Sequence, residues 1–399
     1  MQITLSAGAR EGCLALPPSK SIAHRKIILA ALAPAGGDLR LTEISNDIQD
    51  TLNLVKSLGS TIAITETNQA HHIKIGPIPK KIETPIHIHV TESATTLRIA
   101  LILAPTLAEH ITFTAGESLA ARPMDEGIRF LKARGVQVKG PWPIVTTGRL
   151  RYTQAEIEAQ TTGQFATGAL IAALTQPRPI SLRLKHPASM PYIRMTAQMI
   201  AEAGVKIEEK NNTFVVRQGE IHATSPHVEG DRSHAAAFIV ANEMGSAIRL
   251  ENLDPQSLQG DKDIHTHINA MKEHKIVDLT HHPDLLMALA VLATKYGATF
   301  TGIRRLRTKE TDRIAATAHM LRALGIATET TDDRLIVAPG TITAGTVDTA
   351  GDHRIAFAAF AAACAATGPI TLKNPETVKK SWPGFYAAVE KLTIRNEKP

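Results

Sequence analysis

The chain has 399 residues, of which 43% are hydrophobic and 21% are charged. This length accommodates roughly two or three domains of a globular protein. Its two cysteines, Cys13 and Cys364, are too few for a disulfide framework, so we expect a cytoplasmic protein. The sequence has neither an apolar run of about 18 residues nor a signal-peptide core, so we expect neither a membrane span nor export. The net charge of +6 suits acidic metabolites, whereas scattered basic residues and 4% aromatics argue against nucleic acid.

One pattern occurs six times along the chain. Each copy begins with an alanine-rich apolar helix, and these predicted helices start near residues 21, 94, 163, 233, 281 and 351. A short alternating run follows each helix and is typical of a strand. A second helix comes next, expected at 47–60, 124–136, 192–205, 261–274, 311–325 and 382–392. A spacing of mostly about seventy residues predicts a repeated α/β unit, with three copies sharing one core in each of two lobes.

The first helix of each copy is apolar nearly all round, which predicts burial, yet its first turn carries polar residues. In the stretch LPPSKSIAHRKIILAALA, residues 16–33, Lys20, Ser21 and Arg25 lie at such a helix start. Free N–H groups and the positive end of the helix dipole favour anions there. Several such helix starts facing one cleft would form an anion-binding site.

Several stretches carry a resemblance to a known family. LPPSKSIAHR resembles the signature Leu-Pro-Gly-Ser-Lys-Ser-x-x-x-Arg of the 5-enolpyruvylshikimate-3-phosphate synthase family. RLRTKETDRIAATAHMLRALG is similar to the second signature of that family, GDHRIAFAAF to its Asp-His-Arg helix start, and VKKSWPGFYAAVEKL to its C-terminal segment. SMPYI, HHPDLLMALAVLA and VEGDRSHAAAF match in order, so the resemblance extends from about Ile3 to Leu392.

The resemblance implies an α/β fold, the two-lobed inside-out α/β barrel of enolpyruvyl transferases, with six βαβαββ repeats, three per lobe. One lobe would combine residues 1–18 with 230–399 and the other would be 19–229, with the active site in the cleft between them. The implied reaction transfers the enolpyruvyl group of phosphoenolpyruvate to the 5-hydroxyl of shikimate 3-phosphate. Phosphate leaves by addition and elimination, in the shikimate pathway to chorismate and aromatic amino acids. Neither a metal nor an organic cofactor is implied, and we expect a monomer.

The resemblance also assigns roles to individual residues. The expected catalytic residues are Lys20, which would touch both substrates, Asp284 as base for the 5-hydroxyl, and Glu310 as proton donor to the methylene carbon. Shikimate 3-phosphate would be bound by Lys20, Ser21, Arg25, Thr162, Gln164, Ser189, Tyr192, Asp284 and Lys309. Phosphoenolpyruvate would be bound by Lys20, Ala94, Gln164, Arg313, His353, Arg354 and Lys380. Asp352 is expected to orient its neighbours.

Simpler interpretations stay open for some of these residues. Lys309 and Arg313 also fit a solvent-exposed helix, where residues four apart are neighbours. Asp284 follows a proline, which is typical of a helix cap. Tyr192 fits an aromatic residue at a helix start.

The phosphoenolpyruvate side departs from the family pattern at two positions. The family segment Asn-Ala-Gly-Thr reads ESAT here, so Glu92 replaces Asn and Ala94 replaces the Gly that borders phosphoenolpyruvate. A methyl group there narrows the pocket for longer ligands, and we therefore expect weak inhibition by glyphosate.

Two further positions lack a side chain that the family pattern carries. The family triplet Ser-Ser-Gln reads Thr-Gly-Gln here, with Gly163 in place of the second hydroxyl. An arginine that binds phosphoenolpyruvate in the family aligns with Ser118, which predicts a raised KM for phosphoenolpyruvate or a loss of activity. The arginines that are candidates to replace it are Arg98, Arg122 and Arg149.

Two alternative functions stay open. The sister transferase that acts on UDP-N-acetylglucosamine carries a reactive cysteine in the loop that here reads AGESLAARPM, which contains none. A non-catalytic or repurposed anion-binding homologue is favoured by Ser118 and Gly163 and opposed by the intact charged positions. Binding of shikimate 3-phosphate without turnover would distinguish that homologue.

Overall fold

The computed structural model describes residues 2–67, 70–79, 81–82 and 85–395. These residues divide into two compact units. The continuous unit is Lys20–Val228, and the split unit combines the segment up to Ser19 with the chain from Glu229 onward. The repeated α/β architecture expected from the sequence is confirmed, because every apolar helix is followed by a strand in both units.

The described part of the continuous unit contains three sheets, with strand orders β3-β5-β4, β6-β7-β9-β8 and β10-β11-β13-β12. Their strands are β3 (Gly37–Leu41), β4 (Ile62–Glu66), β5 (His71–Ile75), β6 (Ile86–Val90), β7 (His110–Ala115), β8 (Gln137–Lys139), β9 (Ile144–Thr147), β10 (Gln154–Glu158), β11 (Ile180–Lys185), β12 (Ile207–Lys210) and β13 (Thr213–Val216). The pairs β6–β7 and β10–β11 are parallel, and β8–β9 and β12–β13 are antiparallel hairpins. A parallel pair requires a crossover connection, and in both pairs this connection is the apolar first helix of the repeat.

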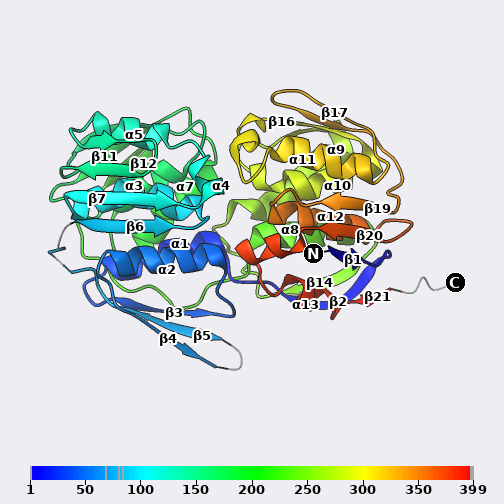
Figure 1. The fold of residues 1–399 in the computed structure, drawn as a ribbon, viewed down its shortest axis with the longest axis horizontal. Helices are drawn as coiled ribbons and strands as arrows, with labels where there is room; N and C mark the ends of the chain where they lie inside the picture. Colours follow the sequence, from blue (N-terminus) through cyan, green and yellow to red (C-terminus); the bar gives the residue numbers. More distant parts are fainter. Residues whose placement is uncertain (1, 68–69, 80, 83–84, 396–399) are drawn as a thin grey trace. The chain divides into compact units, whose positions relative to one another are not determined.

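The first helices of these three copies are α1 (Lys20–Leu32), α3 (Ala94–Leu107) and α6 (Gln164–Ala173). The second helices are α2 (Asn46–Ser57), α5 (Asp125–Lys132) and α7 (Met190–Glu202), and α4 (Glu117–Ala120) is a short extra turn. Nearly every side chain of α3 and α6 is buried, as predicted, and α1 and α2 lie side by side along the first sheet (Figure 1). Gly168 lets α3 and α6 approach closely, since a Cβ there would lie 3.1 Å from the Ile99 Cα.

The split unit has sheets of order β1-β20-β19, β14-β2-β21 and β15-β16-β18-β17 among its described residues. Their strands are β1 (Gln2–Leu5), β2 (Arg10–Ala15), β14 (Ala247–Glu251), β15 (Ile276–Asp278), β16 (Ala298–Thr301), β17 (Thr328–Thr330), β18 (Leu335–Val337), β19 (Gly345–Asp348), β20 (Ile370–Lys373) and β21 (Thr393–Ile394). The N-terminal strands β1 and β2 pair with β20 and β14, which lie far along the chain (Figure 1). Both ends of the chain therefore contribute to the sheets of this unit.

The inner helices of the split unit are α8 (Arg232–Glu243), α10 (Leu286–Tyr296) and α12 (His353–Ala363), which pack against one another. The outer helices are α9 (Ile264–His274), α11 (Arg313–Ala323) and α13 (Phe385–Val389), with the 3-10 turns η1 (Gly260–Asp263), η2 (Pro283–Leu285), η3 (Arg304–Thr308) and η4 (Pro375–Lys380). Helix α13 is shorter than the predicted 382–392. Pro383 and Gly384 are poor residues for a helix interior, so the helix begins only after them.

Aromatic side chains gather in one place in the split unit. Within the described chain, an aromatic cluster packs around α8, α12 and α13 and consists of Phe238, Phe357, Phe360, Trp382, Phe385 and Tyr386. Its rings make mainly tilted and edge-to-face contacts, with centroids between 4.7 Å and 6.4 Å apart. Aliphatic residues make up most of the rest of the core, together with single buried rings such as Phe113, Phe214 and Phe300.

Candidate active site

The predicted site residues lie at or beside helix starts in both units. In the continuous unit they are Lys20, Ser21 and Arg25 on α1, Ala94 at the start of α3, Thr162 and Gln164 at the start of α6, and Ser189 and Tyr192 at the start of α7. In the split unit they are Asp284 in η2, Lys309, Glu310 and Arg313 at the start of α11, His353 and Arg354 at the start of α12, and Lys380 at the end of η4. Each unit therefore gathers its own set of polar groups.

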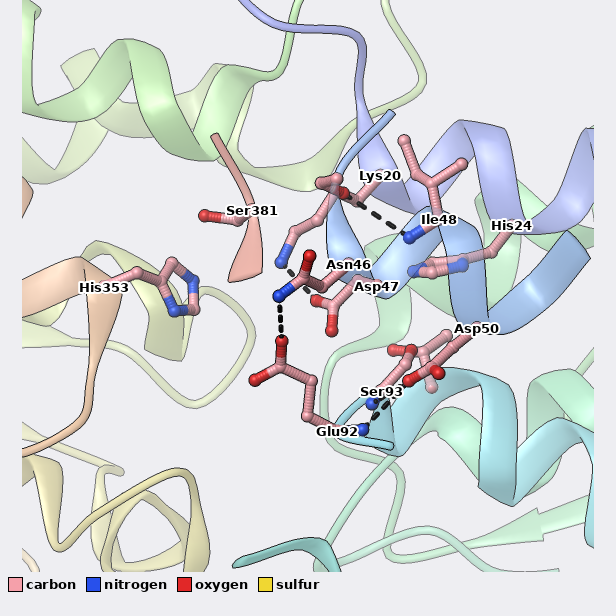
Figure 2. A network of polar contacts seen from close by, with 12 residues as sticks. Lys20, His24, Asn46, Asp47, Ile48, Asp50, Glu92, Ser93, His353 and Ser381 are labelled. Atoms are coloured by element: carbon pink, nitrogen blue, oxygen red, sulfur yellow. Dashed lines mark hydrogen bonds and ion pairs between the residues drawn. The ribbon is translucent and has the colours of Figure 1, made fainter. Parts of the chain in front are cut away.

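Lys20 forms an ion pair with Asp47 from the first turn of α2. Its Nζ lies 2.6 Å from the Asp47 Oδ2, and the two side chains are 12% and 8% exposed (Figure 2). The neighbouring Asn46 donates from Nδ2 to the Glu92 Oε1 at 2.8 Å, so α2 also contacts the loop before α3. No sequence motif marked Asp47 as a partner of Lys20. Only the packing of α1 against α2 brings the two together.

Asp50 holds the loop that leads into α3. Its carboxylate accepts backbone N–H bonds from Thr91 at 3.0 Å and from Glu92 and Ser93 at 2.9 Å (Figure 2). Ser93 then caps α3, because its side chain accepts from the backbone N–H of Thr96. The position of Ala94, which is 6% exposed, is therefore fixed from both sides. Sequence analysis missed Asp50, which lies in an ordinary amphipathic helix.

Arg25 lies inside the continuous unit and is 3% exposed. Its guanidinium donates to the hydroxyls of Thr196 at 2.8 Å and Thr167 at 3.2 Å, and to the carbonyls of Ser21 at 2.6 Å and Tyr192 at 3.1 Å. Burial lowers the Arg25 pKa to about 10. These bonds connect α1 with α6 and α7.

Gln164 and Arg98 join the starts of α3 and α6. Gln164 donates from Nε2 to the Thr95 hydroxyl at 2.7 Å and accepts at Oε1 from Arg98 at 2.8 Å. Arg98 also donates to the Pro123 carbonyl at 3.1 Å, and the Gln164 backbone N–H donates to the Thr162 hydroxyl at 3.2 Å. This network positions the side chain of Gln164 between two helix starts.

The departures from the family pattern have local explanations. A Cβ on Gly163 would lie 3.0 Å from the Ile193 Cγ1, so a side chain there requires Ile193 to move. Ser118 lies on α4 and is exposed. Of the candidate replacement arginines, Arg122 is 7% exposed, whereas Arg149 follows β9 and lies 3.4 Å from Glu109, just beyond the C-terminal end of α3. Arg149 is therefore remote from the start of that helix.

Charged residues of the split unit form one ion cluster around Arg313. Its Nε lies 2.6 Å from the Asp352 Oδ2, its Nη1 lies 2.7 Å from the Asp284 Oδ1, and its Nη2 lies 2.7 Å from the Glu310 Oε2. Arg354 adds a second cation, with its Nη2 3.0 Å from the Asp284 Oδ2. Arg313 is 2% exposed, so the interpretation of a solvent-exposed helix is wrong for it.

Asp352 orients its neighbours within this cluster. Besides pairing with Arg313, its Oδ1 accepts the backbone N–H of Arg354 at 2.9 Å and so caps α12. The carboxylate is completely buried. A buried carboxylate with both a guanidinium and a helix start as partners fixes the directions of Arg313 and Arg354.

The ion cluster changes the proton affinities of its members. Burial would raise the Asp284 pKa, but Arg354, Arg313 and Lys309 together hold that pKa below its usual range. Burial lowers the Lys309 pKa to about 8, with Arg313 and Arg305 acting in the same direction and Asp284 opposing them. Arg305, which sequence analysis missed, has its pKa lowered by burial to about 10. At neutral pH the cluster therefore holds Asp284 as a carboxylate and Lys309 as a cation.

Two predicted residues of the split unit lie beside the aromatic cluster. His353 is 1% exposed, and its ring centroid is 5.7 Å from that of Phe357 in an edge contact. Lys380 is 5% exposed and directly precedes Ser381 and Trp382. Asp284, Glu310, Arg313 and Arg354 meet in the ion cluster. His353 follows Asp352 of this cluster, and Lys380 precedes Ser381, whose hydroxyl is bonded to His234 of α8.

In the part of the chain that the structure describes, no group of three His, Cys, Asp or Glu side chains is placed to hold a metal ion. None of the described helices combines the length and apolar character needed to cross a membrane. Cys13 and Cys364 are both free thiols.

The chain is similar to one known protein family over nearly its whole length. The family model of EPSP synthase (3-phosphoshikimate 1-carboxyvinyltransferase) matches residues 7–389. A 3-phosphoshikimate 1-carboxyvinyltransferase of Clostridium kluyveri is 31% identical over 96% of this chain and 95% of its own length. One of Methanosphaerula palustris is 32% identical over 94% and 95%. The solved EPSP synthase of Acinetobacter baumannii matches 98% of both chains with a TM-score of 0.79 at 23% identity.

The fold of two units, each with three sheets and buried inner helices in its described part, is that of the enolpyruvyl transferases, as predicted. The polar residues at the starts of those helices suit anionic ligands. The chain belongs to the EPSP synthase family. The family expected from the sequence signatures, and with it the transferase class, is confirmed.

Proposed function

We propose that the protein transfers the enolpyruvyl group of phosphoenolpyruvate to the 5-hydroxyl of shikimate 3-phosphate. The ion cluster of the split unit carries this proposal. It combines two guanidiniums, a lysine and three carboxylates at the positions that the family signatures predict. The cations can exchange these carboxylate partners for the phosphates and carboxylates of two anionic substrates and so reduce the repulsion between the substrates. We also propose that the two units correspond to the lobes of the family fold.

In this mechanism Asp284 and Glu310 move the protons. Asp284 takes the proton of the 5-hydroxyl as that oxygen bonds to C2 of phosphoenolpyruvate, and Glu310, in its protonated form, gives its proton to C3. In the elimination, the C3 proton returns to the Glu310 carboxylate, the bond from C2 to the phosphate oxygen breaks, and the leaving phosphate takes the proton from Asp284, which gives the enolpyruvyl ether. Arg313 and Arg354 keep Asp284 weakly basic in the free protein. Binding of phosphoenolpyruvate to those two arginines raises the Asp284 pKa and so prepares the base.

Residues of the continuous unit take part in binding. Lys20 touches both substrates, and Asp47 keeps its ammonium in place beforehand. Shikimate 3-phosphate is bound by Ser21, Arg25, Thr162, Gln164, Ser189 and Tyr192, together with Lys309 and Asp284 of the split unit. Phosphoenolpyruvate is bound by Ala94 and Gln164, together with Arg313, His353, Arg354 and Lys380 of the split unit.

Arg122 is the arginine best placed to supply the charge that Ser118 lacks. It is buried and directly precedes Pro123, whose carbonyl binds Arg98. Arg149 pairs with Glu109, beyond the far end of α3. We therefore assign the additional contact with phosphoenolpyruvate to Arg122.

We further propose that the protein acts in the cytoplasm as a monomer. Two free thiols, one of them buried, fit a reducing compartment. Light scattering during size-exclusion chromatography tests the oligomeric state. A mass near 42.9 kDa is expected, and twice that value would contradict a monomer.

The decisive test of the function is phosphate release with both substrates present and with each omitted in turn. Turnover that requires both substrates supports the synthase. Binding of shikimate 3-phosphate by a folded protein without turnover would favour the non-catalytic homologue. Turnover with UDP-N-acetylglucosamine in place of shikimate 3-phosphate would favour the sister transferase.

Weak inhibition by glyphosate is the specific consequence of Ala94. Asp50 and Ser93 fix the segment around this residue, so its methyl group cannot move aside for a longer ligand. The Ala94→Gly variant should bind glyphosate about tenfold or more tightly, since overpacking of this kind costs roughly 1–3 kcal/mol. Inhibition of the wild type at low micromolar glyphosate would contradict the proposal.

A further inference from the structure

Asp231, His234 and Ser381 form a row of polar contacts in the split unit, beside the ion cluster. The His234 Nδ1 lies 2.8 Å from the Asp231 Oδ1, and its Nε2 lies 3.0 Å from the Ser381 Oγ. The side chains are buried, with 3%, 1% and 1% of the three residues exposed. These distances are those of an acid–imidazole–hydroxyl relay.

Burial excludes the nucleophilic role that such a row has in hydrolases. A nucleophilic serine must reach a substrate carbonyl, and Ser381 is closed off from solvent. The ring of His234 is also enclosed, with centroids 4.9 Å from Phe357 and 5.8 Å from Trp382. The row is therefore a fixed connection between parts of the chain.

The row connects the start of α8 with the end of η4. Asp231 caps α8 by accepting the backbone N–H of His234, and its own N–H donates to the Pro17 carbonyl at 2.9 Å. Ser381 directly follows Lys380, which is 5% exposed. A carboxylate at Nδ1 selects the tautomer with its proton there, so Nε2 accepts the hydrogen bond from the Ser381 hydroxyl.

We propose that His234 is a positioning residue that holds Ser381, and through it Lys380, in the orientation that binds phosphoenolpyruvate. The inference rests on the proposed function, in which Lys380 contacts that substrate. The direction of the Lys380 side chain depends on its backbone, and the next residue is tied to α8 by this row. Without the row, the ammonium is free to adopt other rotamers, and binding becomes weaker.

Four variants test this role. His234→Ala removes both the contact with Asp231 and the hydrogen bond with Ser381, Ser381→Ala removes only the hydrogen bond, and Ser381→Thr retains the hydroxyl. Phe385→Leu is the matched control. Phe385 lies in the aromatic cluster next to His234, with its ring centroid 5.4 Å from that of Trp382, and its side chain has no polar atom that could bond to the row. It reproduces a loss of packing while keeping the hydrogen bonds.

The first readout is the Michaelis constant for each substrate. We expect His234→Ala and Ser381→Ala to raise the KM for phosphoenolpyruvate about tenfold, with little change for shikimate 3-phosphate, and Ser381→Thr to restore the wild-type value. Phe385→Leu should lower the melting temperature at least as much as His234→Ala and Ser381→Ala do, but without a selective increase in the KM for phosphoenolpyruvate. Equal increases in both KM values would overturn the inference.

The second readout does not require turnover. An amine-reactive reagent, with modification of Lys380 quantified by mass spectrometry, should label this residue several-fold faster in Ser381→Ala than in wild type and Phe385→Leu. Unchanged labelling would overturn the positioning role. A wild type without turnover would instead contradict the proposed function, and the labelling result would still decide the role of His234.

Discussion

The two units share one repeat but stabilise their buried arginines differently. In the split unit, Arg313 is surrounded by the carboxylates of Asp284, Glu310 and Asp352. In the continuous unit, Arg25 is surrounded by hydroxyls and backbone carbonyls. The pKa of Arg313 is accordingly raised despite its burial, whereas burial lowers that of Arg25.

This difference indicates how each unit responds to an anion. A guanidinium that already pairs with carboxylates binds an anionic substrate by exchanging partners, and the released carboxylate gains proton affinity. A guanidinium held by neutral groups has no such partner to release and keeps its helices in place. The split unit is therefore expected to show the stronger dependence on pH and charge, and the continuous unit to act as a preformed frame.

The largest expected effect is on stability and compares the two arginines directly. Arg313→Ala leaves three carboxylates without their shared cation and should cost about 3–5 kcal/mol of unfolding free energy. Arg25→Ala leaves only hydroxyls and carbonyls unsatisfied and should cost about 1–3 kcal/mol. Urea denaturation measures both. Arg322→Ala replaces an exposed residue on α11 and is the control. Its free energy of unfolding should stay within about 0.5 kcal/mol of the wild-type value. Equal losses for Arg313 and Arg25 would remove the distinction between the units.

The next prediction concerns the pH dependence of activity. With the Lys309 pKa near 8, the side chain loses its charge above that pH, so kcat/KM for shikimate 3-phosphate should fall up to about tenfold per pH unit. Lys309→Arg keeps its charge and should lack this decrease.

The stability of the folded protein should change with pH in the opposite direction. The unfolded lysine holds its proton to a higher pH, so between pH 8 and 10 the wild type should gain stability relative to Lys309→Arg. An unchanged activity profile in Lys309→Arg would exclude Lys309 as the group responsible.

The smallest expected effect concerns Glu126 in the continuous unit. Its Oε1 accepts from the backbone N–H of Thr161 at 3.2 Å, and burial raises its pKa. When the pKa of a carboxyl is higher in the folded than in the unfolded protein, the free energy of unfolding decreases as the pH rises from the unfolded pKa through the folded pKa. Glu126→Gln should therefore be as stable as the wild type near pH 4 and more stable near pH 7, by about 1 kcal/mol or less. The exposed neighbour Asp125→Asn is the control and should not change this pH dependence.

Much of the fold followed from local sequence patterns. The six apolar helices and the strands after them lie where alternation and helical periodicity placed them, because a buried helix or strand must be apolar in its own period. The short α13 departs from the pattern since Pro383 and Gly384 interrupt it. The pairing of β1 with β20 and of β2 with β14 was not predictable, because strands pair across long separations without a local signal.

The candidate site likewise has features that the sequence predicted and features that only the tertiary structure determined. Sequence alone identified the chemical groups, since the signatures around Lys20, Glu310 and Arg354 determine which side chains stand at helix starts. Only the tertiary structure assigned their partners, such as Asp47 for Lys20 and Asp50 for the loop before α3. The physical reason is that residue type fixes charge and hydrogen-bonding capacity locally. Which groups satisfy that capacity, and in what protonation state, depends on distances that arise only when separate segments pack together.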